Sequence, residues 1–258
     1  MRNVLAVAGK ELRTYFHSPI AYLVMTLYAV LCGFFFFSLT SRMVAYTFQM
    51  QMRGEMGMPS INLNDMLIRG LFEGILTVIM VLFLIPLITM RLYAEEKKSG
   101  TIELLLTSPL TDMQVILGKF LGALALYVTL MVITFLFISL WFIYGNPNAK
   151  PLIANALGIL LFGAALLALG MWFSSLTKNQ IIAAALAAAV FLLLYVLDWS
   201  TDYSSGVASR VLSYLALPSH FDSFAKGVID LGDVVYYVSV TVVGLFLTAR
   251  SVETFRGA

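Results

Sequence analysis

The chain has 258 residues, of which 60% are hydrophobic and only 12% are charged, and its mean hydropathy is +0.92. Soluble proteins carry ~25% charged residues, so this composition excludes an ordinary soluble domain and indicates an integral membrane protein. The net charge of +2 is too small to indicate a nucleic-acid-binding protein, and no basic cluster alternates with aromatic residues.

The N-terminal segment, residues 1–19, predicts an interfacial helix. Val4, Leu12 and Phe16 recur at helical spacing among basic residues, a pattern typical of a helix that lies on a membrane surface. A secretory signal peptide is the alternative. The apolar run over residues 20–39 is long for a signal core, and no small-residue cleavage site follows it, so we expect a retained first span.

Six apolar runs, with their flanking residues, are long enough to cross a bilayer. They predict an all-α integral membrane protein with a single transmembrane domain over residues 1–258. Pro86 lies inside the second span, where neighbouring helices can tolerate it. The predicted spans are residues 20–39, 74–90, 114–144, 152–176, 181–198 and 234–250.

Two local patterns concern helix ends and helix faces. Thr111 and Gln114 form a capping box that predicts the start of the third helix. Alanines at 183–185 and 187–189 give the fifth span small side chains, which allow close helix approach in lipid. Either the core of the bundle or a dimer seam would use such a face.

The segment over residues 94–108 contains the densest cluster of charge in the sequence. After this cluster, Gly100 can end a helix in the left-handed conformation. Thr101 is then the predicted N-cap of a short helix that stops at Pro109, with too few apolar residues to span a bilayer. That helix lies beside the membrane, where it either offers its leucines to a partner or packs on lipid and on its own neighbours.

A second polar interval, residues 199–233, predicts an external hairpin of two short apolar helices broken at Pro218. Ser219 with Asp222 predicts the start of the second helix. Such helices can dip back into the membrane only where protein covers their backbone ends. One face of the second helix would carry Phe221, Phe224 and Val228.

The sequence contains none of the common catalytic, metal-binding or nucleotide-binding motifs. There is no H-E-x-x-H, G-x-S-x-G, cysteine cluster or phosphate-binding G-x-x-x-x-G-K-[ST], and no polar interval is long enough to hold a nucleotide-binding domain. His220, beside Ser219, is interpreted as a packing residue. Methionines between residues 40 and 73 suit Cu(I) but show no fixed ligand spacing. We expect no catalytic residue, no metal site and no cofactor bound by this chain.

The distribution of lysines and arginines between the two sides predicts the orientation of the chain in the membrane. With the N-terminus inside, ten of the 16 lie inside and six outside, which agrees with the positive-inside rule. Both termini and residues 94–108 are then expected in the cytosol.

Residues Glu95–Pro109 read E-E-K-K-S-G-T-I-E-L-L-L-T-S-P, which resembles the signature loop of the ABC-2 type permeases. In particular, it resembles the branch linked to gliding motility and to maturation of copper enzymes. Residues Lys10–Tyr22 resemble the start of the same branch, and residues 210–230 resemble its outer gate region, so the likeness covers most of the chain. In that family the loop forms a coupling helix that docks in a groove of a separate ATPase subunit.

The resemblance implies a permease subunit in a bacterial cytoplasmic (inner) membrane, in contact with lipid, with ATP-Mg bound by a partner ABC ATPase and with a second permease half, identical or different, beside it. A force-transmitting or anchoring subunit without substrate flux, or an intramembrane enzyme, are the alternatives. If the chain is such a permease subunit, Glu95, Glu96 and Glu103 would pair with basic residues of the ATPase. Alternatively, these glutamates are a run of charge exposed to solvent. The implied ATPase-coupling residues are Glu95, Glu96, Gly100, Thr101, Ile102, Glu103, Leu104, Leu105 and Leu106, and the implied outer gate contains Pro218, His220, Phe221 and Phe224.

Overall fold

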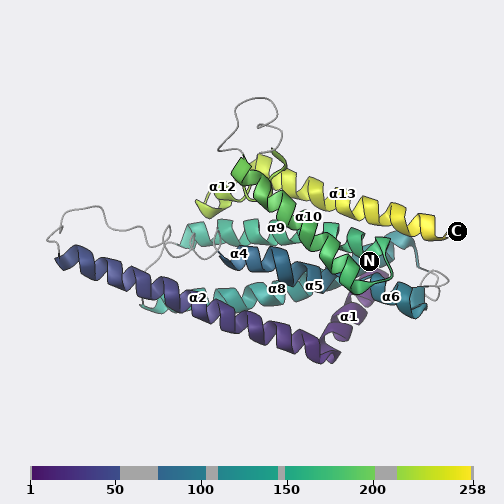
Figure 1. Cartoon of the computed structure of the whole chain (residues 1–258), viewed down its shortest axis with the longest axis horizontal. Helices are drawn as coiled ribbons and strands as arrows, with labels where there is room; N and C mark the ends of the chain where they lie inside the picture. The colour runs from purple at the N-terminus through teal and green to yellow at the C-terminus, as the bar shows by residue number, and fades with distance from the viewer. Residues whose placement is uncertain (1, 53–74, 103–109, 145–148, 201–213, 257–258) are drawn as a thin grey trace.

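The computed structural model describes residues 2–52, 75–102, 110–144, 149–200 and 214–256. In these residues every regular element is a helix, and Figure 1 shows the long helices running side by side in an elongated bundle. The prediction of an all-α membrane protein is confirmed, since six helices are long and apolar enough to cross a bilayer. They cover Ala21–Met52, Thr77–Ser99, Asp112–Ile143, Pro151–Leu176, Gln180–Leu197 and Leu231–Thr254.

Helices α1 (Arg2–His17) and α2 (Pro19–Met52) meet at a sharp elbow. Because proline disfavours the helical conformation in the residue before it, the chain breaks at Ser18. Helix α2 has 34 residues and is therefore ~51 Å long, against ~30 Å for the hydrocarbon core of a bilayer. The run predicted to end at residue 39 continues as a helix because no glycine or proline follows before Met52.

The second span is interrupted twice. Helix α4 (Ile75–Ile79) passes into a π-helical turn, η2 (Met80–Leu84), which is followed by α5 (Ile85–Thr89). The wider turn directly precedes Pro86, which has no N–H to donate and whose ring needs space in the preceding turn. A second break follows at residues 90–93, before α6 (Ala94–Ser99).

Helix α9 (Ala149–Leu176) lies at the centre of the bundle and packs against helices from four of the other spans. Small residues make these contacts possible. A side chain at Gly163 would overlap the Tyr127 ring, and one at Gly170 would overlap Thr89. The neighbours of α9 are α5, α6, α8 (Asp112–Tyr144), α10 (Gln180–Ser200), α12 (Asp222–Ala225) and α13 (Leu231–Arg256).

The alanines of α10 divide between two faces. Ala183 and Ala187 are buried against the bundle, whereas Ala185 and Ala189 are exposed. The bundle core therefore uses the first pair.

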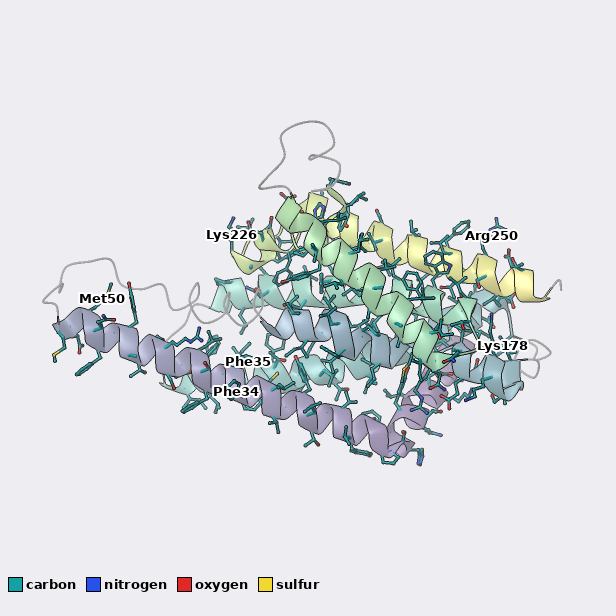
Figure 2. The ribbon with its side chains drawn as sticks, viewed as in Figure 1. Phe34, Phe35, Met50, Lys178, Lys226 and Arg250 are labelled. Carbon is teal, nitrogen blue, oxygen red and sulfur yellow. The ribbon has the colours of Figure 1, made fainter. Side chains whose placement is uncertain are left out.

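Helices α1 and α6 and the C-terminal end of α13 lie at the same end of the bundle (Figure 1). Lys178 and Arg250 lie at this end in Figure 2, and Lys226 lies toward the opposite end. The described segment that leads into residues 94–108 therefore shares one end of the molecule with both described chain ends.

Candidate functional site

Helix α6 leads directly into the loop that carries the predicted coupling residues. It ends at Gly100, whose φ of 74° is left-handed, so the predicted glycine stop is confirmed. The hydroxyl oxygens of Ser99 and Thr101 lie 2.9 Å apart across this turn. Thr101 and Ile102 begin a further helical turn, and Ile102 is buried. Glu103, Leu104, Leu105 and Leu106 lie outside the described residues.

Ser174 of α9 fills the break between α5 and α6. Its Oγ accepts hydrogen bonds from the backbone N–H groups of Tyr93 and Ala94, at 3.1 Å each, and donates to the Met90 carbonyl at 3.0 Å. These backbone groups have no partner within a helix because the helix is interrupted there. The Nζ of Lys97 also donates to the Ser175 carbonyl. The base of the loop is therefore fixed to the central helix.

A buried group of charges joins three helices beside this break. Lys119 of α8 is only 1% exposed, and its Nζ lies 2.9 Å from Glu11 Oε1 on α1 and 2.7 Å from Glu96 Oε1 on α6. Lys10 completes the group, with its Nζ 3.5 Å from Glu96 Oε1. Two lysines balance two glutamates, which is the condition under which charges can be buried. We call Lys10, Glu11, Glu96 and Lys119 the charge cluster.

The charge cluster depends on close approach of α1 to α8. A Cβ at Gly118 would lie 2.5 Å from the Cβ of Val7, and one at Gly122 would lie 2.7 Å from the Cβ of Glu11. The two glycines are four residues apart, so they lie on one face of α8. This G-x-x-x-G spacing around Lys119 is the sequence signal that could have indicated the site.

The start of α8 is capped, and two further hydrogen bonds hold α1 in place. The predicted capping box is confirmed: the Thr111 N–H donates to Gln114 Oε1 at 3.4 Å, and the Gln114 N–H donates to Thr111 Oγ1 at 3.3 Å. Asn3 of α1 donates to the same Gln114 oxygen at 3.3 Å. The Tyr15 hydroxyl donates to the Ile88 carbonyl at 2.8 Å, and burial raises the pKa of this phenol.

Glu95 also has a partner within the chain. Its carboxylate accepts two hydrogen bonds from Arg91, at 2.8 and 3.3 Å, and Arg91 in turn donates to Ser18 at 3.4 Å. Glu95 and Glu96 were expected to meet basic residues of a partner or to be solvated. Within the chain, Glu95 pairs with Arg91 and Glu96 pairs with Lys119 and Lys10, and the pairing of these glutamates with a partner stays a prediction.

The predicted outer residues lie near the other end of the bundle. His220 is a packing residue, as expected: its ring stacks on Tyr236 with centroids 3.7 Å apart, its Nδ1 lies 2.8 Å from Asp233 Oδ1, and its Nε2 lies 3.0 Å from the Tyr214 carbonyl. Pro218 lies in the turn just before, where its carbonyl accepts from the Phe221 N–H at 2.9 Å.

The predicted helix start at Ser219 is wrong. Helix α12 begins at Asp222, and the Ser219 hydroxyl donates backwards to the Ala216 carbonyl at 2.7 Å. Phe221 and Phe224 are buried on α9, as a shared face requires, but Val228 is 57% exposed. The helix has ended before Val228, because Gly227 takes a φ of 79°.

No group of three or more His, Cys, Asp or Glu residues placed to hold a metal occurs among the residues that the structure describes. The predicted methionine-rich segment is described only as far as Met52, and its remaining methionines lie outside the described residues.

Six apolar helices among the described residues, with α9 at their centre, define a multi-pass α-helical membrane protein. The chain belongs to the family described as ABC-2 family transporter protein, which it matches over residues 5–212. It is thus a membrane permease component of an ABC transporter, a class of subunit without an ATPase domain of its own. A search of curated proteins finds no match.

Proposed function

We propose that this chain is one permease half of an ABC transporter of the gliding-motility and copper-enzyme-maturation branch, driven by a separate ATPase subunit that binds ATP-Mg. The half works beside a second half in a bacterial cytoplasmic membrane, with both termini in the cytosol. The observation that carries the proposal is the charge cluster. It fastens the segment leading into residues 94–108 to α1 and α8, so a push on that loop is passed to the bundle.

The transmission has two branches. Closure of the ATPase dimer pushes the turn that begins at Thr101, and α6 carries the displacement. One branch runs through Glu96 and Lys119 into α8, and the other runs through Ser174 into α9. Coupling requires only that the two arrangements of these helices differ in affinity for the nucleotide-bound ATPase.

The residues of the loop then have separate roles. Glu95 and Glu96 position α6, and Gly100 sets the direction in which the next turn leaves. Ile102 is buried and anchors this turn in the core, while Glu103 and the three leucines after it, Leu104 to Leu106, contact the ATPase, with the leucines supplying most of the buried area.

At the far end, His220, Phe221 and Phe224 form part of the outer gate. Phe224 lies against Gly158 of α9, and His220 is held by α13. Ser174, at the other end of α9, is hydrogen-bonded to the start of α6. A movement of α6 relative to α9 therefore changes the packing of α9 against these outer residues.

A force-transmitting subunit without flux is the second candidate. The observation that favours it is the length of α2, which continues to Met52, twelve residues beyond the hydrogen bond that Thr40 accepts from Trp141 of α8 at 2.9 Å. Such an extension offers a handle to an external protein. A complex reconstituted in vesicles that changes conformation with ATP but transports no solute would favour this candidate over an exporter.

The loop is tested with Leu105→Asp, which places a charge among the proposed contact leucines. Co-purification of the co-expressed ATPase should be lost, while the matched Leu176→Asp, an exposed leucine at the same end of the bundle, should retain it. Sidedness is tested with Ser99→Cys, because Ser99 is exposed and Cys32 is buried. Labelling of that thiol by an impermeant maleimide from the outside of intact cells would overturn the proposed orientation.

A further inference from the structure

The exposed side of α1 carries a stripe of polar and basic side chains that shares only Lys10 with the charge cluster. Lys10, Arg13, Thr14 and His17 follow one another at the spacing of a single helical face. With Ser18 they line an open cavity of about 490 Å³. The acidic residue of this helix, Glu11, is turned away and buried against Lys119. The cavity therefore has positive charge on its wall and suits an anion.

Both fixed cations of this stripe are accessible. The Lys10 side chain is 59% exposed, and its contacts of 3.5 and 3.7 Å to Glu96 and Glu11 are long for ion pairs. Arg13 is exposed, and no carboxylate lies within ion-pair distance of it among the described residues. A phosphate at this position would gain charge-assisted hydrogen bonds without displacing a strong internal pair.

The polar cavity continues into an apolar slot beneath the elbow. A second cavity, of about 270 Å³, shares Lys10 and Thr14 with the first, and its wall is polar, with the carboxylates of Glu11, Glu95 and Glu96 paired to Lys119 and Arg91. This second cavity shares Tyr15 and Arg91 with a narrow slot of about 30 Å³, whose surface is almost wholly apolar. The slot is completed by Ala21, Val24 and Met25 of α2, by Leu87, Ile88 and Met90 from the end of the second span, and by Leu126 and Leu130 of α8.

We propose that the elbow binds one anionic phospholipid, with its phosphate against Lys10 and Arg13 and the first carbons of one acyl chain entering the apolar slot. The order of the cavities matches the order of a bilayer leaflet, with headgroups at the interfacial helix and acyl chains beside the spans. An apolar slot offers water too few hydrogen-bond partners, and it contributes nothing to the binding of a free phosphate. Lipid binding at this site does not involve the ATPase, so it can be tested independently of the proposed coupling.

The test is native mass spectrometry of the purified full chain in a neutral detergent, with phosphatidylglycerol and phosphatidylcholine of equal chain length supplied together. We expect one phosphatidylglycerol to be retained in preference to phosphatidylcholine. Because each basic residue near a lipid surface changes apparent affinity about fivefold, Lys10→Gln with Arg13→Gln should weaken phosphatidylglycerol retention by about twenty-fold or more. Lys10→Arg with Arg13→Lys should restore retention. Val24→Trp should reduce retention of the lipid while leaving the two cations in place.

The matched control is Arg2→Gln, which removes a positive charge from the same helix at a residue that lines none of these cavities. An equal loss of retention in this control would overturn the proposal in favour of general surface charge. Displacement of the lipid by millimolar glycerol phosphate, or full retention in Val24→Trp, would show a phosphate site without an acyl-chain slot and would also overturn it. Thermal unfolding of each variant in lipid-free detergent separates loss of binding from loss of fold.

Discussion

The Nζ of Lys119 lies 2.7 Å from Glu96 Oε1, and this contact joins the N-terminal part of α8 to the short helix α6 that leads into the loop. Lys119 also binds Glu11 on α1, so a single buried side chain holds three elements together. A surface pair would contribute little, but a buried charge that loses its partner is costly. The stability of this end of the bundle therefore depends on Lys119.

Replacing Lys119 with methionine should lower the stability of the chain by about 3–5 kcal/mol, because both glutamates lose their buried cation and keep only the longer contacts to the exposed Lys10. The measurement is the thermal unfolding midpoint in detergent, beside ATPase stimulation in the complex. Lys98→Met removes an exposed charge from the neighbouring helix and should change neither quantity.

The triple variant Lys119→Met, Glu11→Leu, Glu96→Leu separates pairing from packing. Replacement of a whole buried charge group by apolar side chains is often neutral, so this variant should regain most of the midpoint lost by Lys119→Met. An unfolding midpoint as low as that of the single variant would contradict the electrostatic explanation.

Ser174→Ala should destabilise the chain by about 1–3 kcal/mol, because two buried N–H groups and the Met90 carbonyl lose their partner. Hydrogen exchange should rise at Tyr93 and Ala94 before it rises elsewhere in the bundle. Ser99→Ala removes an exposed hydroxyl from the same region and is the control. If exchange at Tyr93 stays at the level of the unchanged protein, Ser174 does not close the break.

Gly163→Ala should be destabilising even though alanine favours helix by about 1 kcal/mol. The added Cβ would lie 2.2 Å from the Tyr127 ring, whose hydroxyl donates to the Ile159 carbonyl at 2.9 Å. Overpacking of this kind costs about 1–3 kcal/mol. Gly9→Ala meets no atom within 4 Å and should be neutral or stabilising. The comparison of the two unfolding midpoints checks the packing of α8 on α9, and equal midpoints would count against it.

Local signals predicted the helices and several of their ends. The apolar runs indicated six spans, Gly100 indicated a helix stop, and Thr111 with Gln114 indicated a helix start, since each depends only on residues within a turn or along one helix. The same kind of signal failed at Ser219, where the hydroxyl found a carbonyl behind it and the helix began three residues later.

The charge cluster could not be predicted in this way because its members come from distant parts of the chain. Lys119 is 108 residues from Glu11, and Ser174 is 81 residues from Tyr93. In the sequence Glu96 belongs to a run of charges that is typical of a solvated face. Only the packing of α1 on α8, permitted by Gly118 and Gly122, buries it.

Gly100→Ala tests whether the direction of the loop matters separately from its contacts. A Cβ at Gly100 meets no atom within 4 Å, so steric overlap with other residues is not at issue. The φ of 74° alone costs alanine about 1–2 kcal/mol. We expect a small loss in unfolding midpoint but a clear loss of ATPase co-purification, because the turn beginning at Thr101 leaves α6 in another direction. Gly100→Asn, which tolerates this conformation better, should recover the interaction. Unchanged co-purification from Gly100→Ala would mean that the ATPase does not depend on how this turn is presented.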